Sequence, residues 1–198
     1  MLSLRPMTGQ DLPLVAGWLR QPHISVWWLP GTTAEEEAAK YRARVVHGAD
    51  AGTHLLTVCV AGIPVGWCQW YLWADDLAAA EAMDALPGEA GIDYAIGDPA
   101  HTGHGTGTEL IAALVAEVRR HHPGAGILVD PDARNTASRR VLEKNGFRLV
   151  AVRPVATEPG TEPMAIYRLP GDSRPAAGNL LARPSRARRD ERPGSQVG

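Results

Sequence analysis

Cysteines and long apolar segments are scarce in this sequence. Its 198 residues include only two cysteines, and no apolar run approaches the ~20 residues that a membrane-spanning helix needs. Cys59 and Cys68 each lie in a strand-like run, and a turn at Gly62-Ile63 would leave them unpaired across a hairpin, so we expect buried free thiols. The N-terminus also lacks the charged-then-apolar pattern of a secretion signal. These absences favour a cytoplasmic protein with no membrane partner.

An excess of positive charge is absent as well. The net charge is −2, and residues 171–198 carry six arginines against three acidic residues, which leaves residues 1–170 at −5. An acidic body suits a cationic substrate and argues against a nucleic-acid partner. The segment 171–198 is rich in Pro, Arg, Gly and Ser and has few large apolar side chains, so we expect a disordered tail. One folded domain, residues 1–170, is therefore expected before it. The sequence carries no signal for the oligomeric state.

The apolar patterns predict an α/β (α+β) domain, with a mixed, largely antiparallel sheet flanked by helices. Strands are expected at Leu2–Arg5, Thr53–Ala61, Pro64–Trp73, Gly91–Gly97, Ile127–Val129, Phe147–Val155 and Met164–Leu169. Helices are expected after a cap at Thr8 with Asp11 as its capping-box partner, and at Ala34–Val46, Glu109–Arg120 and Asn135–Asn145. Residues 21–33 are expected to form a loop, and residues 75–88 a helical turn or a flap.

A glycine-rich turn, Gly103-His104-Gly105-Thr106-Gly107-Thr108, separates an expected strand from an expected helix. Glycine lets the backbone bend sharply and lets an anion approach closely, and the first amides of the helix are unpaired donors at the positive end of its dipole. No Lys-Ser/Thr follows the last glycine, which excludes a P-loop, and the turn lies past the midpoint of the chain, unlike a dinucleotide-binding turn. The pattern indicates a phosphate site of another kind.

A second block follows about thirty residues later, NTASRRVLEKNGF at residues 135–147. With it the chain resembles the GNAT superfamily of acyl-CoA-dependent N-acyltransferases over roughly residues 2–170. Their pyrophosphate loop reads Arg/Gln-x-x-Gly-x-Gly/Ala, and their next helix reads Asn-x-x-Ala/Ser-x-x-x-Tyr-Glu-Lys-x-Gly-Phe. The resemblance implies acetyl-CoA as cosubstrate and no metal.

The same resemblance implies the residues that contact the cosubstrate. The backbone of Tyr94, Ala95 and Ile96 would run beside the pantetheine arm and supply a donor to the thioester oxygen. Asn135 and Ser138 would contact the pantetheine or its phosphate end. The pyrophosphate would be held by the turn and the residue before it: Thr102, Gly103, His104, Gly105, Thr106, Gly107 and Thr108.

Two positions depart from the family pattern. Thr102 stands where Arg or Gln is usual, so one charged phosphate contact is replaced, in part by His104. Leu142 stands where the family has a tyrosine that is often proposed to protonate the CoA thiolate. Because a thiol has a pKa near 8.5, the thiolate leaves tolerably without an acid, so we expect activity to survive.

Asp93 is the expected general base. It lies in the middle of an apolar strand, where an aspartate is disfavoured and is costly to bury without a task. An amine substrate is protonated at neutral pH and must lose a proton before it attacks the thioester, and a carboxylate can take that proton.

Local segments resemble aminoglycoside 6'-N-acetyltransferases: residues 23–28 their His-Ile-x-x-Trp-Trp, residues 66–71 their Gly-Tyr-Ala-Gln-x-Tyr, and residues 91–93 their Gly-Ile-Asp. Asp130-Pro131 matches an acidic substrate contact of that group. The resemblance implies a polycationic amine as substrate, antibiotic resistance as the outcome, and carboxylates and aromatic rings as its binding groups. The substrate contacts expected are Trp28, Gln69, Tyr71, Asp84, Asp93, Asp130 and Glu162.

Two alternatives stay open. Acyltransferases that modify hydroxylysine in siderophore synthesis share the Trp-rich segment and the run at Ile96–Ala100, but they typically carry histidine where Asp93 stands. A CoA-binding module without turnover is the other alternative, because Leu142 replaces the tyrosine.

Overall fold

A computed structural model describes residues 1–29, 31–47, 52–156 and 160–171. Seven strands form one sheet in the order β1-β2-β3-β4-β5-β7-β6. The strands are β1 (Leu2–Pro6), β2 (Thr53–Val60), β3 (Ile63–Leu72), β4 (Ala90–Ile96), β5 (Ile127–Val129), β6 (Arg148–Ala156) and β7 (Thr161–Leu169). The helices are α1 (Leu12–Leu19), α2 (Pro22–Trp28), α3 (Ala34–His47), α4 (Leu77–Ala82), α5 (Thr106–His121) and α6 (Thr136–Lys144), with 3-10 turns η2 (Trp73–Asp75) and η3 (Pro99–His101).

The predicted sheet is confirmed: β4 and β5 are parallel neighbours, and every other neighbouring pair is antiparallel. Cys59 and Cys68 are buried and free, as predicted. The prediction for residues 172–198 lies outside the described residues. No helix in the described ranges is long and apolar enough to cross a membrane.

Three local predictions need correction. Residues 22–28 form the helix α2 rather than a loop, with a proline in its first turn, where the missing N–H costs nothing. The helix α5 begins at Thr106, so the last residues of the glycine-rich turn are its first turn. The helix α1 begins at Leu12, after the expected start, although the Asp11 carboxylate does reach back to the Thr8 amide at 2.8 Å.

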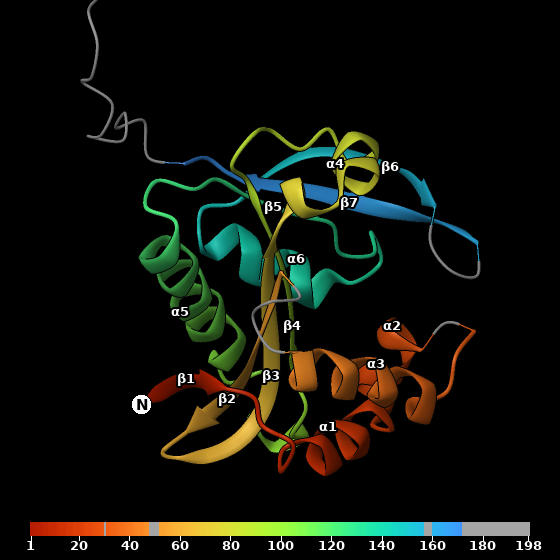
Figure 1. The fold of residues 1–198 in the computed structure, drawn as a ribbon, viewed down its shortest axis with the longest axis vertical. Helices are drawn as coiled ribbons and strands as arrows, with labels where there is room; N and C mark the ends of the chain where they lie inside the picture. The colour runs from red at the N-terminus through yellow and green to blue at the C-terminus, as the bar shows by residue number, and fades with distance from the viewer. Residues whose placement is uncertain (30, 48–51, 157–159, 172–198) are drawn as a thin grey trace, which may run out of the picture.

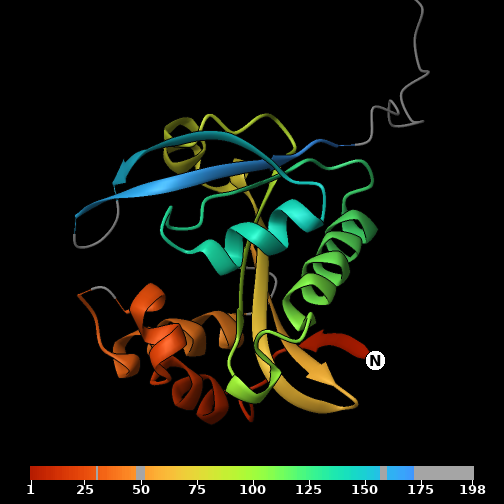
Figure 2. The same cartoon turned by 180° about the vertical axis from the view of Figure 1, so that it is seen from behind.

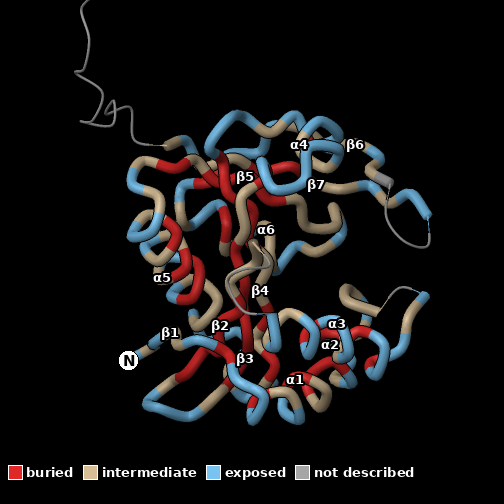
Figure 3. Tube along the Cα trace, in the orientation of Figure 1, coloured by how far each residue is buried: buried red, intermediate tan, exposed pale blue. Residues whose placement is uncertain are grey.

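Helices cover both faces of the sheet, with α1–α3 on one side and α5 and α6 on the other (Figures 1 and 2). The buried residues run through β2, β3 and β4 between these layers (Figure 3). Alternate residues of β4 serve the two cores: Ile92 and Tyr94 pack with α5 and α6, and Ala95 packs with α1–α3. Asp93 therefore faces the α1–α3 side.

The sheet divides between β4 and β5. Along the described chain these strands pair only at Ala90 with Ile127 and at Gly91 with Leu128. From Ile92 onward the β5 side of β4 has no strand beside it, while β3 continues to pair with β4 up to Ile96. In Figure 1, β3 and β4 run vertically, and β6 and β7 cross above them. The divergence opens the sheet next to Asp93.

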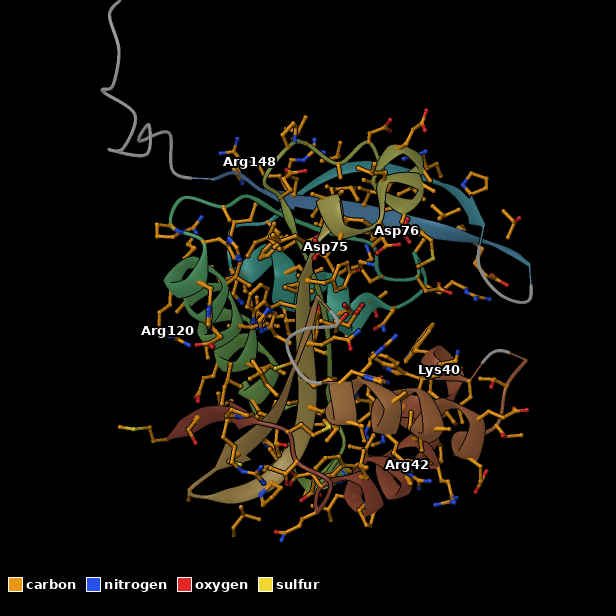
Figure 4. The ribbon with its side chains drawn as sticks, in the orientation of Figure 1. Lys40, Arg42, Asp75, Asp76, Arg120 and Arg148 are labelled. Atoms are coloured by element: carbon orange, nitrogen blue, oxygen red, sulfur yellow. The ribbon has the colours of Figure 1, made fainter. Side chains whose placement is uncertain are left out.

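Exposed basic side chains are distributed over separate elements. Lys40 and Arg42 lie on α3, Arg120 lies on α5, and Arg148 begins β6 (Figure 4). These four side chains do not form a single basic face.

Candidate active site

A cavity of about 230 Å³ lies where β4 and β5 diverge. Its walls come from α2, from the middle of β4, from the end of β5 and the loop after it, from the start of α6, and from β7. The lining residues are Trp27, Trp28, Ile92, Asp93, Tyr94, Val129, Asp130, Pro131, Asp132, Asn135, Ser138, Glu162 and Met164. Segments far apart in the sequence thus bring four carboxylates and two tryptophans together.

Asp93 is held in this cavity by a cross-strand contact. Gln69 on β3 is its direct partner in the β3–β4 register, and Gln69 Nε2 donates to Asp93 Oδ2 at 2.6 Å. Arg44 on α3 donates from Nη1 to Gln69 Oε1 at 3.0 Å, which fixes the orientation of the amide. Burial raises the pKa of Asp93, and the Gln69 hydrogen bond and the Arg44 charge oppose that rise. An aspartate with a raised pKa that still has a partner for its anion suits proton transfer near neutral pH.

Asp130 adds a second carboxylate, at the end of β5. Burial, and then the charge of Asp93, raise the pKa of Asp130 to about 7. In the part of the chain that the structure describes, Asp130 makes no ion pair, whereas Arg134 pairs with both Asp132 and Glu162, at 2.6 Å and 3.2 Å. A bound cation would therefore stabilise the ionised forms of Asp93 and Asp130.

The tryptophans are positioned by α2. His23 Nε2 lies 3.0 Å from the carbonyl oxygen of Ile96, which ties the start of the helix to the end of β4. One turn later, Trp28 packs against Trp67 and Tyr41, with ring centroids 5.4 Å and 6.5 Å away. The same segment thus contributes to the core and to the cavity wall.

The glycine-rich turn leaves open space before α5. Gly103 and Gly105 have φ values of +78° and +88°, and a Cβ atom at either position would meet no atom within 4 Å. The amides of Thr108 and Glu109 both donate to the Gly105 carbonyl. Within the described contacts the amides of Thr106 and Gly107 have no acceptor, so they are available to an anion. Gly107 instead permits close packing, since its Cβ would lie 3.3 Å from Val141 on α6.

Comparison with known proteins identifies the family. The profile described as an acetyltransferase (GNAT) domain matches residues 8–153. The chain belongs to the GNAT acetyltransferase family. It is therefore an N-acetyltransferase, with a single GNAT domain.

Characterised relatives fall into two groups. Aminoglycoside N(6')-acetyltransferase type 1 of Klebsiella pneumoniae is 30% identical over 164 residues, which are 74% of this chain and 73% of the relative. Lysine N-acyltransferase MbtK of Mycobacterium tuberculosis is 29% identical over 170 residues, which are 84% of this chain and 76% of the relative. The crystal structure of aminoglycoside acetyltransferase AAC(6')-Ib with coenzyme A and kanamycin aligns with a TM-score of 0.71 at 29% identity, covering 86% of this chain and 95% of that one.

The start of α6 in this GNAT domain is occupied by local contacts. The Asn135 side chain caps the helix by accepting from the Ser138 amide at 3.0 Å. The Ser138 hydroxyl lies 2.6 Å from the Tyr94 hydroxyl. Leu142, where the resemblance leads us to look for tyrosine, is fully buried in the core beneath α5 and α6.

The other predicted residues lie outside the cavity lining. Tyr71 packs over Gly91, where a Cβ atom would come within 2.3 Å of its ring. Asp84 is exposed and pairs with Arg153 at 3.0 Å. The buried Ala95 packs in the α1–α3 core, Thr102 and His104 are exposed beside the glycine-rich turn, and Gln69 reaches the site only through Asp93.

Sequence reasoning did not single out Asp132, Met164 or Arg44, and it selected Trp28 but not Trp27 as a substrate contact. One signal in the sequence could have indicated that Asp132 lines the cavity: it lies two residues after Asp130, which was predicted as a substrate contact. The described residues contain no group of three or more His, Cys, Asp or Glu side chains placed to hold a metal ion.

Proposed function

We propose that this GNAT enzyme transfers the acetyl group of acetyl-CoA to the 6'-amine of an aminoglycoside, which would confer resistance to the antibiotic. The observation that carries the proposal is the pair Asp93 and Asp130, two half-buried carboxylates beside an aromatic wall that make no ion pair among the described residues. Such a site is costly when empty and becomes favourable when a polycation enters it. The similarity to aminoglycoside acetyltransferases supports the same substrate class.

The side of the β4–β5 divergence that holds the glycine-rich turn fits acetyl-CoA. Open space and unbound amides at Gly103–Gly107 suit the pyrophosphate, and the unpaired edge of β4 beyond Gly91 suits the amide-containing pantetheine arm. A backbone amide of Tyr94–Ile96 can donate to the thioester oxygen. Acetyl-CoA supplies the activated acetyl group, so the chain's task is to orient the amine and move its protons.

Asp93 removes the proton that the ammonium group must lose before it attacks, and then the proton that the nitrogen loses as the amide forms. Gln69 holds the carboxylate in position, and Arg44 acts through Gln69 as a positioning residue that limits the rise in the Asp93 pKa. Trp27 and Trp28 offer aromatic faces to the sugar rings.

A second candidate, acylation of a lysine-type amine, is favoured by the similarity to lysine N-acyltransferase MbtK. A lysine-type substrate carries an α-carboxylate at the far end from its side-chain amine, and the negative cavity would repel that carboxylate, which an aminoglycoside lacks. The charge of the cavity therefore favours the aminoglycoside.

A thiol-release assay with acetyl-CoA tests the proposal. The acceptors are kanamycin, neomycin, an aminoglycoside that lacks a 6'-amine, and hydroxylysine. We expect thiol release with the two 6'-amino compounds alone. Release with hydroxylysine instead would establish the lysine-type alternative, and binding of acetyl-CoA without release from any acceptor would indicate a CoA-binding module.

A further inference from the structure

The helix α6 offers no proton donor at position 142. Leu142 has no exposed surface and contributes to the core shared with α5 and β4. Toward the cavity, α6 and its cap present Ser138, one turn before Leu142, and Asn135, about two turns before it. Position 142 therefore cannot supply a proton to the departing sulfur.

Tyr94 places a phenol in the cavity beside this part of α6. It lies on the α5–α6 face of β4, opposite to Asp93, because consecutive residues of a strand point to opposite faces. Both side chains reach the same cavity because β5 has already diverged from β4 at this point. The Tyr94 hydroxyl is 2.6 Å from Ser138 Oγ and 3.4 Å from the Ser138 carbonyl oxygen.

We propose that Tyr94 is the general acid of this enzyme, in the role that position 142 cannot fill; the inference rests on the proposed function. Tyr94 gives its hydroxyl proton to the sulfur as the carbon–sulfur bond breaks, and the electron pair of that bond stays on the sulfur and forms the S–H bond. The bound ammonium first gives one proton to water through Asp93, and the neutral nitrogen then forms the new bond to the acetyl carbon and gives its second proton to Asp93. Asp93 then releases a proton to water, and the Tyr94 phenolate takes one from water.

The surroundings of Tyr94 keep its hydroxyl protonated. Burial raises its pKa, and the negative charge of Asp93 and the nearby Tyr167 act in the same direction, so the phenol stays protonated across the working range of pH. Either hydroxyl of the Tyr94–Ser138 pair can donate. When Ser138 donates, the Tyr94 oxygen is held in place, and its proton has only the long 3.4 Å contact with the Ser138 carbonyl to exchange for one with the sulfur.

Tyr94→Phe tests the proposal, with Tyr167→Phe as the matched control. Tyr167 also bonds α6 through its hydroxyl, to Glu143 at 2.6 Å and to Arg139 at 3.1 Å, but it does not line the cavity. We expect kcat of Tyr94→Phe to fall by roughly 10- to 100-fold, the low end for general acid catalysis because a thiolate is already a fair leaving group. KM for acetyl-CoA should stay within about threefold, and kcat of Tyr167→Phe should stay near that of the wild type. Equal losses in both variants would mean that the hydroxyls only support α6, and would overturn the proposal.

A binding measurement tests the same contact without turnover. CoA and a CoA analogue that lacks the sulfur are titrated at pH 7 and at pH 9.5, where the CoA thiol ionises. If the Tyr94 hydroxyl lies against the sulfur, it donates to the thiolate, and CoA should gain about tenfold in affinity over the analogue at the higher pH. Tyr94→Phe should lose that gain and Tyr167→Phe should keep it. A wild-type ratio that does not change with pH would overturn the proposal even if Tyr94→Phe fails to fold. That result would leave the proposed function standing. If neither CoA nor the analogue binds, the proposed function and the role of Tyr94 are both excluded.

Discussion

The two faces of β4 beside the cavity are built differently. On the α1–α3 face, Asp93 belongs to a chain of charged and polar side chains that ends in Arg44. On the α5–α6 face, Tyr94 and Ser138 are neutral hydroxyls, and the glycine-rich turn beyond them offers backbone amides and open space. In the proposed mechanism, one face takes a proton from a cation, and the other receives an anion and gives a proton.

Strand geometry explains how two adjacent residues serve opposite tasks. A period of two sends Asp93 and Tyr94 to opposite faces, and the divergence of β5 lets both reach one cavity. A slip of one residue in the β3–β4 register would exchange the faces and separate Asp93 from Gln69. The register is therefore part of the proposed catalytic machinery.

Removing the proposed base, Asp93 on the α1–α3 face, should cause the largest loss of kcat and should leave the binding of acetyl-CoA on the other face unchanged. Asp93→Asn can still accept the hydrogen bond from Gln69 but cannot take a proton, so we expect kcat to fall by about 10²- to 10⁴-fold. The affinity for acetyl-CoA, measured by calorimetry, should not change. Turnover close to that of the wild type would exclude Asp93 as the base.

Asp132→Asn is the matched control, because it removes a carboxylate of the same cavity that is already paired with Arg134. Its effect on kcat should be small.

Arg44→Met keeps Asp93 but removes the charge that lowers the pKa of Asp93, so the acidic limb of the pH–rate profile should move to higher pH. An unmoved limb would mean that Arg44 does not act on the base.

Blocking the glycine-rich turn should affect the other face. Gly105→Val puts a β-branched side chain into the open space before α5, at a φ of +88° that such residues avoid. Losing one or two amide contacts to a charged phosphate should weaken acetyl-CoA binding by about 10- to 100-fold and leave aminoglycoside binding unchanged.

Gly62→Val separates this effect from backbone strain. Gly62 has a φ of +82° and open space around its Cβ position, and it lies in the β2–β3 turn. It should show a similar loss of stability in thermal denaturation with normal acetyl-CoA affinity. Normal affinity in Gly105→Val as well would mean that the glycine-rich turn does not hold the cosubstrate.

Local patterns were sufficient for the sheet and for the position of the glycine-rich turn. Alternation and turn residues indicated each strand, and three glycines before an amphipathic helix indicated the bend at α5. The helix α2 was missed because the β-branched Ile24 and Val26 disfavour a helix locally. Burial of Ile24 in the α1–α3 core and the contact of His23 with Ile96 stabilise it in the folded chain.

The partners of Asp93 could not be read from the sequence. Gln69 was expected to touch the substrate, but its place opposite Asp93 depends on the β3–β4 register. The contact from Arg44 depends on how α3 packs across the sheet, and no spacing in the sequence encodes that packing. Asp84 was selected for its charge alone, and its pairing with Arg153 on β6 is likewise a long-range contact.

Asp130→Asn should have the smallest effect of these variants, and it tests the negative charge of the α1–α3 side of the cavity specifically. The Asp130 pKa of about 7 means that about half of these carboxyls hold a proton at neutral pH, and that a cation entering the cavity displaces it. Aminoglycoside binding near pH 7 should therefore release protons, which calorimetry in buffers of different ionisation enthalpy would detect. Affinity should rise with pH through about 7, because the ionised carboxylate attracts the cation and the protonated one does not. Asp130→Asn should flatten this dependence and lower aminoglycoside affinity about tenfold at pH 8, with acetyl-CoA affinity unchanged.

Unfolding of the ligand-free protein gives an independent check on the direction of the Asp130 pKa shift. A carboxyl whose pKa is about 7 in the folded state and near 4 in the unfolded chain binds more protons when folded, so its contribution to stability is lost as pH rises from about 4 through 7. Asp130→Asn removes that contribution, and its melting temperature should gain on that of the wild type as pH rises over the same range. Parallel melting curves for the two proteins would mean that Asp130 is ionised throughout. The α1–α3 side of the cavity would then carry its negative charge permanently, rather than acquire it when a cation binds.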